Sequence, residues 1–233
     1  MIEISPDEVV LWQWGIIHIN ETIITTWIVM ALMIFLAWIT TRNLLVLPPI
    51  SRRQNLLETI ISAMRSQIRE IAQMDPDRFL PFSGTLFLFI SIANLLDIVP
   101  VYRTPTSSLS TTAALAICVF FAVPIYGIAK LGIADYLKHY IRPTILMLPF
   151  NIIGELSRTL ALAVRLFGNM MSETILVAIL ISIVPLFIPV FLQLLGLLIG
   201  QVQAYIFAVL ATVYIASASS IHEETVKNSG GGI

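Results

Sequence analysis

The sequence predicts an all-α integral membrane protein. Of its 233 residues, 58% are hydrophobic and only 12% are charged, and the mean hydropathy is +0.91. Soluble domains contain about 45–50% apolar residues, so most of this surface should face lipid. The apolar residues form long runs near the roughly 20 residues that a spanning helix needs. We expect one membrane domain, residues 1–233, with spans at about 22–39, 79–99, 112–131, 150–184 and 189–219.

Charge and cysteine content exclude several classes of protein. The formal net charge of −1 gives no sign of a nucleic-acid partner. The single cysteine, Cys118, excludes an intramolecular disulfide. The N-terminal stretch is acidic and lacks the basic region of a cleaved signal peptide, so we expect the first apolar run to stay in the chain.

The first span, residues 22–39, is oriented by the charges around it. Acidic residues precede it, and Arg42, Arg52, Arg53, Arg65 and Arg69 follow it. Basic loops are retained in the cytoplasm, which predicts a non-cytoplasmic N-terminus. Counting spans then gives a cytoplasmic C-terminus. We expect a multi-pass protein of the bacterial inner (plasma) membrane.

Residues 52–73 are expected to form an amphipathic helix on the cytoplasmic surface. Apolar residues recur every three or four positions, while arginines and Glu58 occupy the other face. The alternative is a helix packed on a soluble domain, but no such domain follows in the sequence.

The remaining spans form a short hairpin and two long helices. Residues 79–99 and 112–131 are separated by the polar turn "PVYRTPTSSLSTT". From Pro149, nothing interrupts the next helix until Pro185, which corresponds to about 50 Å of helix. A hydrocarbon core is about 30 Å thick, so this helix should be strongly tilted or broken near Gly168. The span at 189–219 is also overlong, and the polar, Gly-rich residues 220–233 are expected to be a flexible tail.

Polar residues follow one face of the first long helix. At 100° per residue their spacing keeps them on a broad common face, with Leu162 as the apolar residue in register. They are Asn151, Glu155, Arg158, Arg165, Asn169 and Glu173. Charged groups at membrane depth cost about 2.5–3.5 kcal/mol by insertion scales, so they normally face a partner or a water-filled cavity.

Arg165 has no counter-charge within reach on its own helix. Glu155 and Glu173 lie about 15 Å and 12 Å away along the axis. Asn169 can form a hydrogen bond with Arg165 but cannot neutralise it. Arg158, by contrast, has Glu155 three residues earlier, so a structural pair explains it equally well. An arginine keeps its proton in proteins, so we expect the anion facing Arg165 to come from another chain.

The last long helix combines small residues with two glutamine side chains at membrane depth. Gly196, Gly200, Ala204 and Ala208 recur every four residues and allow another helix to approach closely, which ordinary helix packing also explains. Gln201 and Gln203 add hydrogen-bonding groups at the same depth.

Three motifs in order resemble subunit a of F-type ATP synthases, called subunit 6 in mitochondria. They are "NLLDIVP", "RLFGNM" and "QAYIFAVLATVYI", and "YIRPTILMLPFNII" extends the resemblance over nearly the whole chain. The resemblance implies one vertical helix, a cytoplasmic-surface amphipathic helix, a helical hairpin and two strongly tilted helices packed on a ring of c subunits. "NMMS" and "SLSTTAALA" resemble the N-type branch of the family.

The resemblance also implies a function. Such a chain is the stator subunit that forms two ion half-channels and couples H+ or Na+ flow to rotor rotation. Arg165 matches the essential arginine that faces the c-ring carboxylates, and Asn169 and Gln203 match the family's asparagine and glutamine. Asn94 and Asp97 match polar residues of the non-cytoplasmic half-channel. Further ion-pathway candidates are Glu155, Arg158, Glu173 and Gln201.

The expected partners are the c-subunit ring, the peripheral-stalk b subunits, the remainder of the F-type ATP synthase and the lipid bilayer. We expect no cofactor, no metal and no catalytic site within this chain alone. The "HEE" at His222 lacks the second histidine of a metal-binding motif.

The sequence departs from the family pattern at two positions. Thr174 stands where many members have a carboxylate, although Glu173 is adjacent, and Gly196 stands where many have histidine or glutamate. Some plastid-type members share both features. Selection between H+ and Na+ would lie mainly in the c subunit. A self-contained secondary transporter is the alternative function, but its repeated halves are not found here.

Overall fold

The computed structural model describes residues 10–14, 17–42, 52–73, 75–99, 102, 104–134, 136, 147–183 and 188–229. The predicted all-α class is confirmed. The main helices are α1 (Glu21–Thr41), α2 (Arg52–Ala72), α3 (Leu80–Leu96), α4 (Leu109–Leu131), α6 (Met147–Ile183) and α7 (Ile188–Ser229). Short 3-10 turns, η2 (Pro76–Arg78) and η3 (Pro105–Ser107), precede α3 and α4.

A short antiparallel hairpin precedes α1 and was not predicted from the sequence. Strands β1 (Val10–Trp14) and β2 (Ile17–Asn20) pair, with Trp14 opposite Ile17. Both stretches contain the β-branched and aromatic residues that favour strands. Two strands of this length leave the helical class of the protein unchanged.

Four of the helices are long and apolar enough to cross a membrane, namely α1, α4, α6 and α7. The 17-residue α3 is also apolar but shorter. Large apolar side chains such as Phe35, Phe121 and Phe191 are exposed along these helices. Water would not tolerate so much apolar surface, so the chain is a multi-pass membrane protein.

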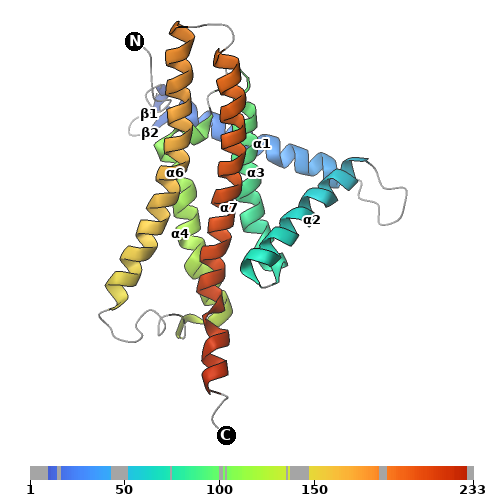
Figure 1. Ribbon diagram of the computed structural model, residues 1–233, viewed down its shortest axis with the longest axis vertical. Helices are drawn as coiled ribbons and strands as arrows, with labels where there is room; N and C mark the ends of the chain where they lie inside the picture. The colour runs from blue at the N-terminus through green and yellow to red at the C-terminus, as the bar shows by residue number, and fades with distance from the viewer. Residues whose placement is uncertain are drawn as a thin grey trace.

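The two longest helices form the centre of the fold. In Figure 1, α6 and α7 run side by side in opposite directions, with α4 and α3 behind them. Leu162 and Leu166 from α6 are buried with Phe207 and Ala211 from α7 and Ile90 from α3. This apolar core fixes the position of α7 between α3 and α6.

The long helix α6 runs without interruption through Gly168. The sequence predicted that this overlong helix is either strongly tilted or broken near Gly168, and the structure shows no break. A glycine inside a helix costs roughly 1 kcal/mol relative to alanine, which the surrounding packing outweighs here. The polar residues of α6 therefore lie on one continuous element.

The C-terminal helix is longer than the sequence predicts. Residues 220–229, expected to belong to a flexible tail, continue α7 to Ser229. No proline or glycine interrupts the chain between Pro189 and Gly230 except the two packed glycines Gly196 and Gly200. Nothing local therefore stops the helix earlier.

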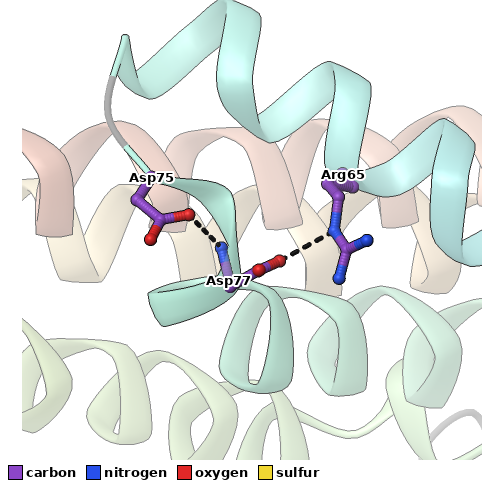
Figure 2. A network of polar contacts seen from close by, with 3 residues as sticks. All are labelled: Arg65, Asp75 and Asp77. Carbon is purple, nitrogen blue, oxygen red and sulfur yellow. Dashed lines mark hydrogen bonds and ion pairs between the residues drawn. The ribbon is translucent and has the colours of Figure 1, made fainter.

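The second half of the amphipathic α2 makes polar contacts with η2 and α7. Arg65 Nε lies 2.7 Å from Asp77 Oδ1, and the Asp77 backbone N–H donates to Asp75 Oδ1 at 3.3 Å (Figure 2). The Tyr205 hydroxyl of α7 donates to Gln67 Oε1 of α2 at 2.8 Å. The location of α2 on the cytoplasmic surface remains a prediction.

Candidate functional site

Arg165 lies near the middle of α6, with its side chain exposed. Its neighbour Leu166 is fully buried, so the backbone at this point is held by the core while the guanidinium points outward. Within the described ranges, the structure gives the Arg165 guanidinium no hydrogen bond and no ion pair. Its side chain is therefore available to a group outside this chain.

The polar stripe of α6 lies at the border between the core and the open surface. Leu162, the apolar residue in the stripe, is 1% exposed, whereas Arg158 and Asn169 are exposed. Glu155 and Glu173 are half-buried. The stripe is therefore partly buried against the core and partly exposed at the surface.

Asn169 and Gln203 join α6 to α7 one helical turn from Arg165. Asn169 Nδ2 donates to Gln203 Oε1 at 2.9 Å. Gln203 is 2% exposed, and its Nε2 has no hydrogen-bond partner among the described atoms. A buried amide N–H without a partner carries a free-energy cost of about 1–3 kcal/mol, so this group is poised to bind an acceptor.

Glu173 packs directly on Gly196 of α7. A Cβ added at Gly196 would overlap the Glu173 carboxylate, so the missing side chain creates the space that the acid occupies. Asp97, after the end of α3, lies close enough to repel Glu173 electrostatically. The Glu173 carboxylate of α6 and the Asp97 carboxylate after α3 therefore lie near enough to interact electrostatically at this end of the α6–α7 contact.

Tyr102 belongs to the same group. Burial and the nearby Asp97 carboxylate both raise the pKa of the Tyr102 phenol above its ordinary value. Its hydroxyl is buried without a hydrogen-bond partner in the described part of the chain. Gln193 Nε2 approaches the Asp97 backbone carbonyl at 3.5 Å. The cluster thus combines two acids with one polar group, the Tyr102 hydroxyl, that has no hydrogen-bond partner among the described residues.

Thr174 stands where many members of the family have a carboxylate, but its side chain bonds to its own helix. Its hydroxyl donates to the Met170 carbonyl of its own helix at 3.0 Å. The acid that contacts α7 is Glu173, one position earlier.

Glu155 and Arg158 lie on the opposite side of Arg165 along α6. The two charges attract each other, as their three-residue spacing predicts. Arg158 Cζ also lies 5.6 Å from the centre of the Tyr214 ring on α7, within range of a cation–π interaction. Arg158 therefore has partners inside this chain, which Arg165 lacks among the described residues.

Asn94, which is buried, and Gln201, which is half-buried, both form hydrogen bonds between α3 and α7. Asn94 Nδ2 donates to the Gly200 carbonyl at 2.8 Å, and Gln201 Nε2 donates to the Ser91 carbonyl at 3.0 Å. Both side chains therefore link α3 to α7.

Sequence reasoning missed four residues that contact the predicted ones: Ser91, Tyr102, Thr106 and Tyr214. The hydroxyl-rich stretch "PTSSLSTT" was a usable signal for Thr106, because buried hydroxyls need partners. The others contact residues more than fifty positions away in the sequence or lie in a turn, and no local pattern marks them.

A metal-binding cluster is not found within the described part of the chain, where no three histidine, cysteine, aspartate or glutamate side chains gather. The side chain of His222 lies outside the described residues.

Comparison with known proteins assigns the chain to a family. The family profile "ATP synthase A chain" matches residues 23–216. The chain is 57% identical to "ATP synthase subunit a 1" of Crocosphaera subtropica over 227 residues, which is 97% of this chain and 99% of that protein. It is 55% identical to "ATP synthase subunit a 1" of Chlorobaculum parvum over 96% of this chain and 99% of that protein. It is also 52% identical to "ATP synthase subunit a" of Albidiferax ferrireducens over 94% of both chains. With these motifs, this helical fold and these matches along almost its entire length, the chain belongs to the ATP synthase A chain family, the subunit a family of F-type ATP synthases.

Proposed function

We propose that this chain forms the two ion half-channels of its complex and presents Arg165 to the carboxylates of a rotating c-subunit ring. Flow of H+ or Na+ along this route would turn the ring. The observation that carries the proposal is the exposed Arg165 guanidinium, which has no counter-charge in the described part of the chain. It lies between Glu155 and Glu173 on the same helix.

Family membership makes the chain the stator subunit a of an F-type ATP synthase and a component of that complex. The direct neighbours are part of the proposal. The c ring would face Arg165, and the peripheral-stalk b subunits would hold the chain still. The N-terminus would be non-cytoplasmic and the C-terminus cytoplasmic, as the distribution of arginines predicts.

A permanent cation at Arg165 explains how the two half-channels stay separate. It favours the ionised form of a passing carboxylate, so that carboxylate must release its ion before it can pass. It also repels a free cation, which opposes a direct leak between the half-channels. Lysine can lose its proton at such a site, whereas arginine cannot.

The acids on either side of Arg165 supply the two ends of the route. Asp97 and Glu173 would line the non-cytoplasmic half-channel, and Glu155 with Arg158 the cytoplasmic one. Glu155 and Glu173 lie about 15 Å and 12 Å from Arg165 along the axis, so neither can neutralise it. Each elementary charge that crosses about 100 mV releases roughly 2.3 kcal/mol, which the ring converts to rotation.

The Asn169–Gln203 contact supports this arrangement. It ties α7 to α6 one turn from Arg165, and the unused Gln203 Nε2 can stabilise an anion or a water molecule there. A self-contained secondary transporter, the alternative from the sequence, has no support from the family match.

The test is the Arg165→Ala variant in the intact complex reconstituted in liposomes. We expect ATP-driven ion uptake to be abolished while the soluble head still hydrolyses ATP. The matched control is Arg65→Ala, which removes an exposed arginine that already has a partner in Asp77 and should leave uptake within about twofold of wild type. Wild-type uptake by Arg165→Ala would refute the proposal. Repeating the wild-type assay over separate pH and Na+ series identifies the ion.

A further inference from the structure

Arg158 of α6 lies over the aromatic ring of Tyr214 on α7. Its Cζ atom is 5.6 Å from the ring centre, within the roughly 6 Å over which the face of an aromatic ring attracts a guanidinium. Glu155, three residues earlier, also attracts Arg158 but belongs to the same helix. Of these two partners, only the Tyr214 ring draws the exposed Arg158 side chain toward α7.

The Tyr214 ring is fixed in place by packing. It is half-buried and contacts two buried apolar clusters, one that contains Leu162 and Phe207 and one that contains Phe79 and Ile215. Close-packed interiors leave such a ring little freedom to move. An arginine side chain on a helix surface, in contrast, has many accessible rotamers. The ring can therefore restrain the arginine without moving with it.

A second contact joins the same two helices in the same register. Asn169 Nδ2 donates to Gln203 Oε1 at 2.9 Å. Asn169 lies eleven residues after Arg158 on α6, and Gln203 lies eleven residues before Tyr214 on α7. Eleven residues make about three helical turns, so the two contacts lie on the same side of each helix. They are two points of one antiparallel packing surface.

Arg165 lies between these two contacts. In the polar stripe of α6, Arg158 precedes it by seven residues and Asn169 follows it by four. Both neighbours contact α7, whereas Arg165 is exposed and has no hydrogen bond or ion pair within the described part of the chain. On this face, α7 therefore holds the polar side chains on both sides of Arg165.

The separation of the two arginines makes the restraint important. Seven residues place Arg158 and Arg165 on the same face of α6, about 10 Å apart along the axis. Without the ring, the long Arg158 side chain could extend along this face toward Arg165. A second mobile cation there would repel a transported cation, and a low dielectric would strengthen that repulsion.

We propose that Tyr214 is a positioning residue whose ring holds Arg158 against α7 and so keeps the route between Glu155 and Arg165 clear of a second mobile cation. The ring acts through Arg158 and does not itself touch the ion. Its hydroxyl takes no part in this role. The inference rests on the proposed function, because it assumes that ions pass between Glu155 and Arg165.

The first test compares Tyr214→Leu with Tyr214→Phe in the intact complex in liposomes. ATP-driven ion uptake is measured, and subunit composition is checked by co-purification. Tyr214→Leu removes the ring and should lower uptake by about threefold to tenfold, the range that the strength of a cation–π contact allows. Tyr214→Phe keeps the ring and should stay within about twofold of wild type. A loss in Tyr214→Phe equal to that in Tyr214→Leu would overturn the inference.

The matched control is Tyr126→Leu. Tyr126 of α4 is also half-buried and packs against the rings of Phe79 and Phe82, but it is not among the cation–π contacts of the described residues. This control makes the same truncation without releasing an arginine, so uptake should stay within about twofold of wild type.

The second test asks whether the effect of Tyr214 passes through Arg158. Arg158→Gln removes the cation and, because Arg158 belongs to the proposed route, has an effect of its own. Tyr214→Leu in the Arg158→Gln background should cause no further loss beyond about twofold, because the side chain that the ring restrains is no longer charged. Independent losses that multiply in the double variant would show that the ring only fills space, and would overturn the inference.

A trifluorinated phenylalanine in place of Tyr214 keeps the ring and its packing, so it decides the matter even if Tyr214→Leu assembles poorly. Fluorine withdraws electron density from the ring face and weakens its attraction for a guanidinium. Uptake should fall below that of Tyr214→Phe when Arg158 is present, and should not fall in the Arg158→Gln background. Equal uptake by the two ring variants with Arg158 present would overturn the inference. Failure of the proposed function gives a different result, namely normal uptake by Arg165→Ala.

Discussion

Two arginines on different helices show how position decides the role of a charge. Arg65 of α2 is 47% exposed and lies 2.7 Å from Asp77, in a surface contact between α2 and η2. Arg165 of α6 is also exposed, but it lies on a long apolar helix and has no such partner among the described residues. Under the proposed function, the counter-charge of Arg165 comes from the c-subunit ring.

The energies of the two sites differ accordingly. An exposed ion pair such as Arg65–Asp77 contributes about 0–1 kcal/mol to stability, because water competes for both charges. An arginine at membrane depth costs about 2.5–3.5 kcal/mol by insertion scales unless a partner or water meets it. The difference teaches that a charged side chain without a partner in an apolar helix indicates an interface with another molecule. A surface charge with a partner, such as Arg65, stabilises only its local structure.

The largest effect among further variants is expected for Gly196→Leu. The new side chain would collide with the Glu173 carboxylate and force α6 and α7 apart about two helical turns from Arg165. We expect ATP-driven uptake to be lost although the complex still assembles, as measured by transport and co-purification. Gly154→Leu is the control, because a Cβ at Gly154 meets nothing within 4 Å. Normal transport by Gly196→Leu would show that the close contact is unimportant.

The next effect is expected for Glu173→Gln, which keeps the shape of the side chain and removes its charge. If Glu173 lines a half-channel for H+, ion flux should fall by about 100-fold, the contribution of a positioned proton-transfer group. The matched control is Glu58→Gln, on the exposed face of α2. Unchanged flux throughout a pH or Na+ titration would make Glu173 a structural residue, like Arg65.

A smaller effect is expected for Gln203→Leu. It removes the acceptor of the part-buried Asn169–Gln203 hydrogen bond, which should destabilise the α6–α7 contact by about 0.5–1.5 kcal/mol. Transport should fall several-fold, and the purified complex should lose subunits at a lower detergent concentration. An unchanged complex with unchanged transport would mean that the core alone holds α6 on α7.

The smallest effect is expected for the Arg65–Asp77 pair. A double-mutant cycle of Arg65→Ala and Asp77→Ala should give a coupling energy of no more than about 1 kcal/mol, measured as the thermal stability of the complex. The coupling should shrink at high salt. A coupling several times larger would contradict the contrast drawn here between the two arginines.

The sequence predicted those features that repeat at helical spacing. The stripe from Asn151 to Glu173 was recognised because polar residues three, four or seven positions apart share a helix face. The missing partner of Arg165 followed from axial distances alone. The class of the fold and the family were likewise accessible, because apolar run lengths and ordered motifs are properties of the chain itself.

Contacts between distant segments were not predictable in this way. The hydrogen bond from Asn94 to the Gly200 carbonyl was not predicted, because Gly200 lies 106 positions later in the chain. The space that Gly196 provides for Glu173 also depends on how α6 and α7 are aligned. The register between two helices is set by packing, which the pattern within either helix does not encode.

The unbroken course of α6 has a mechanical consequence. Thirty-seven residues in one helix form a rod about 55 Å long, and no hinge separates Glu155, Arg165 and Glu173. A stationary part that opposes a turning rotor must not bend under torque. Under the proposed function, the stiffness of this single rod keeps the ion entrance, the barrier and the ion exit at constant spacing while the ring steps past.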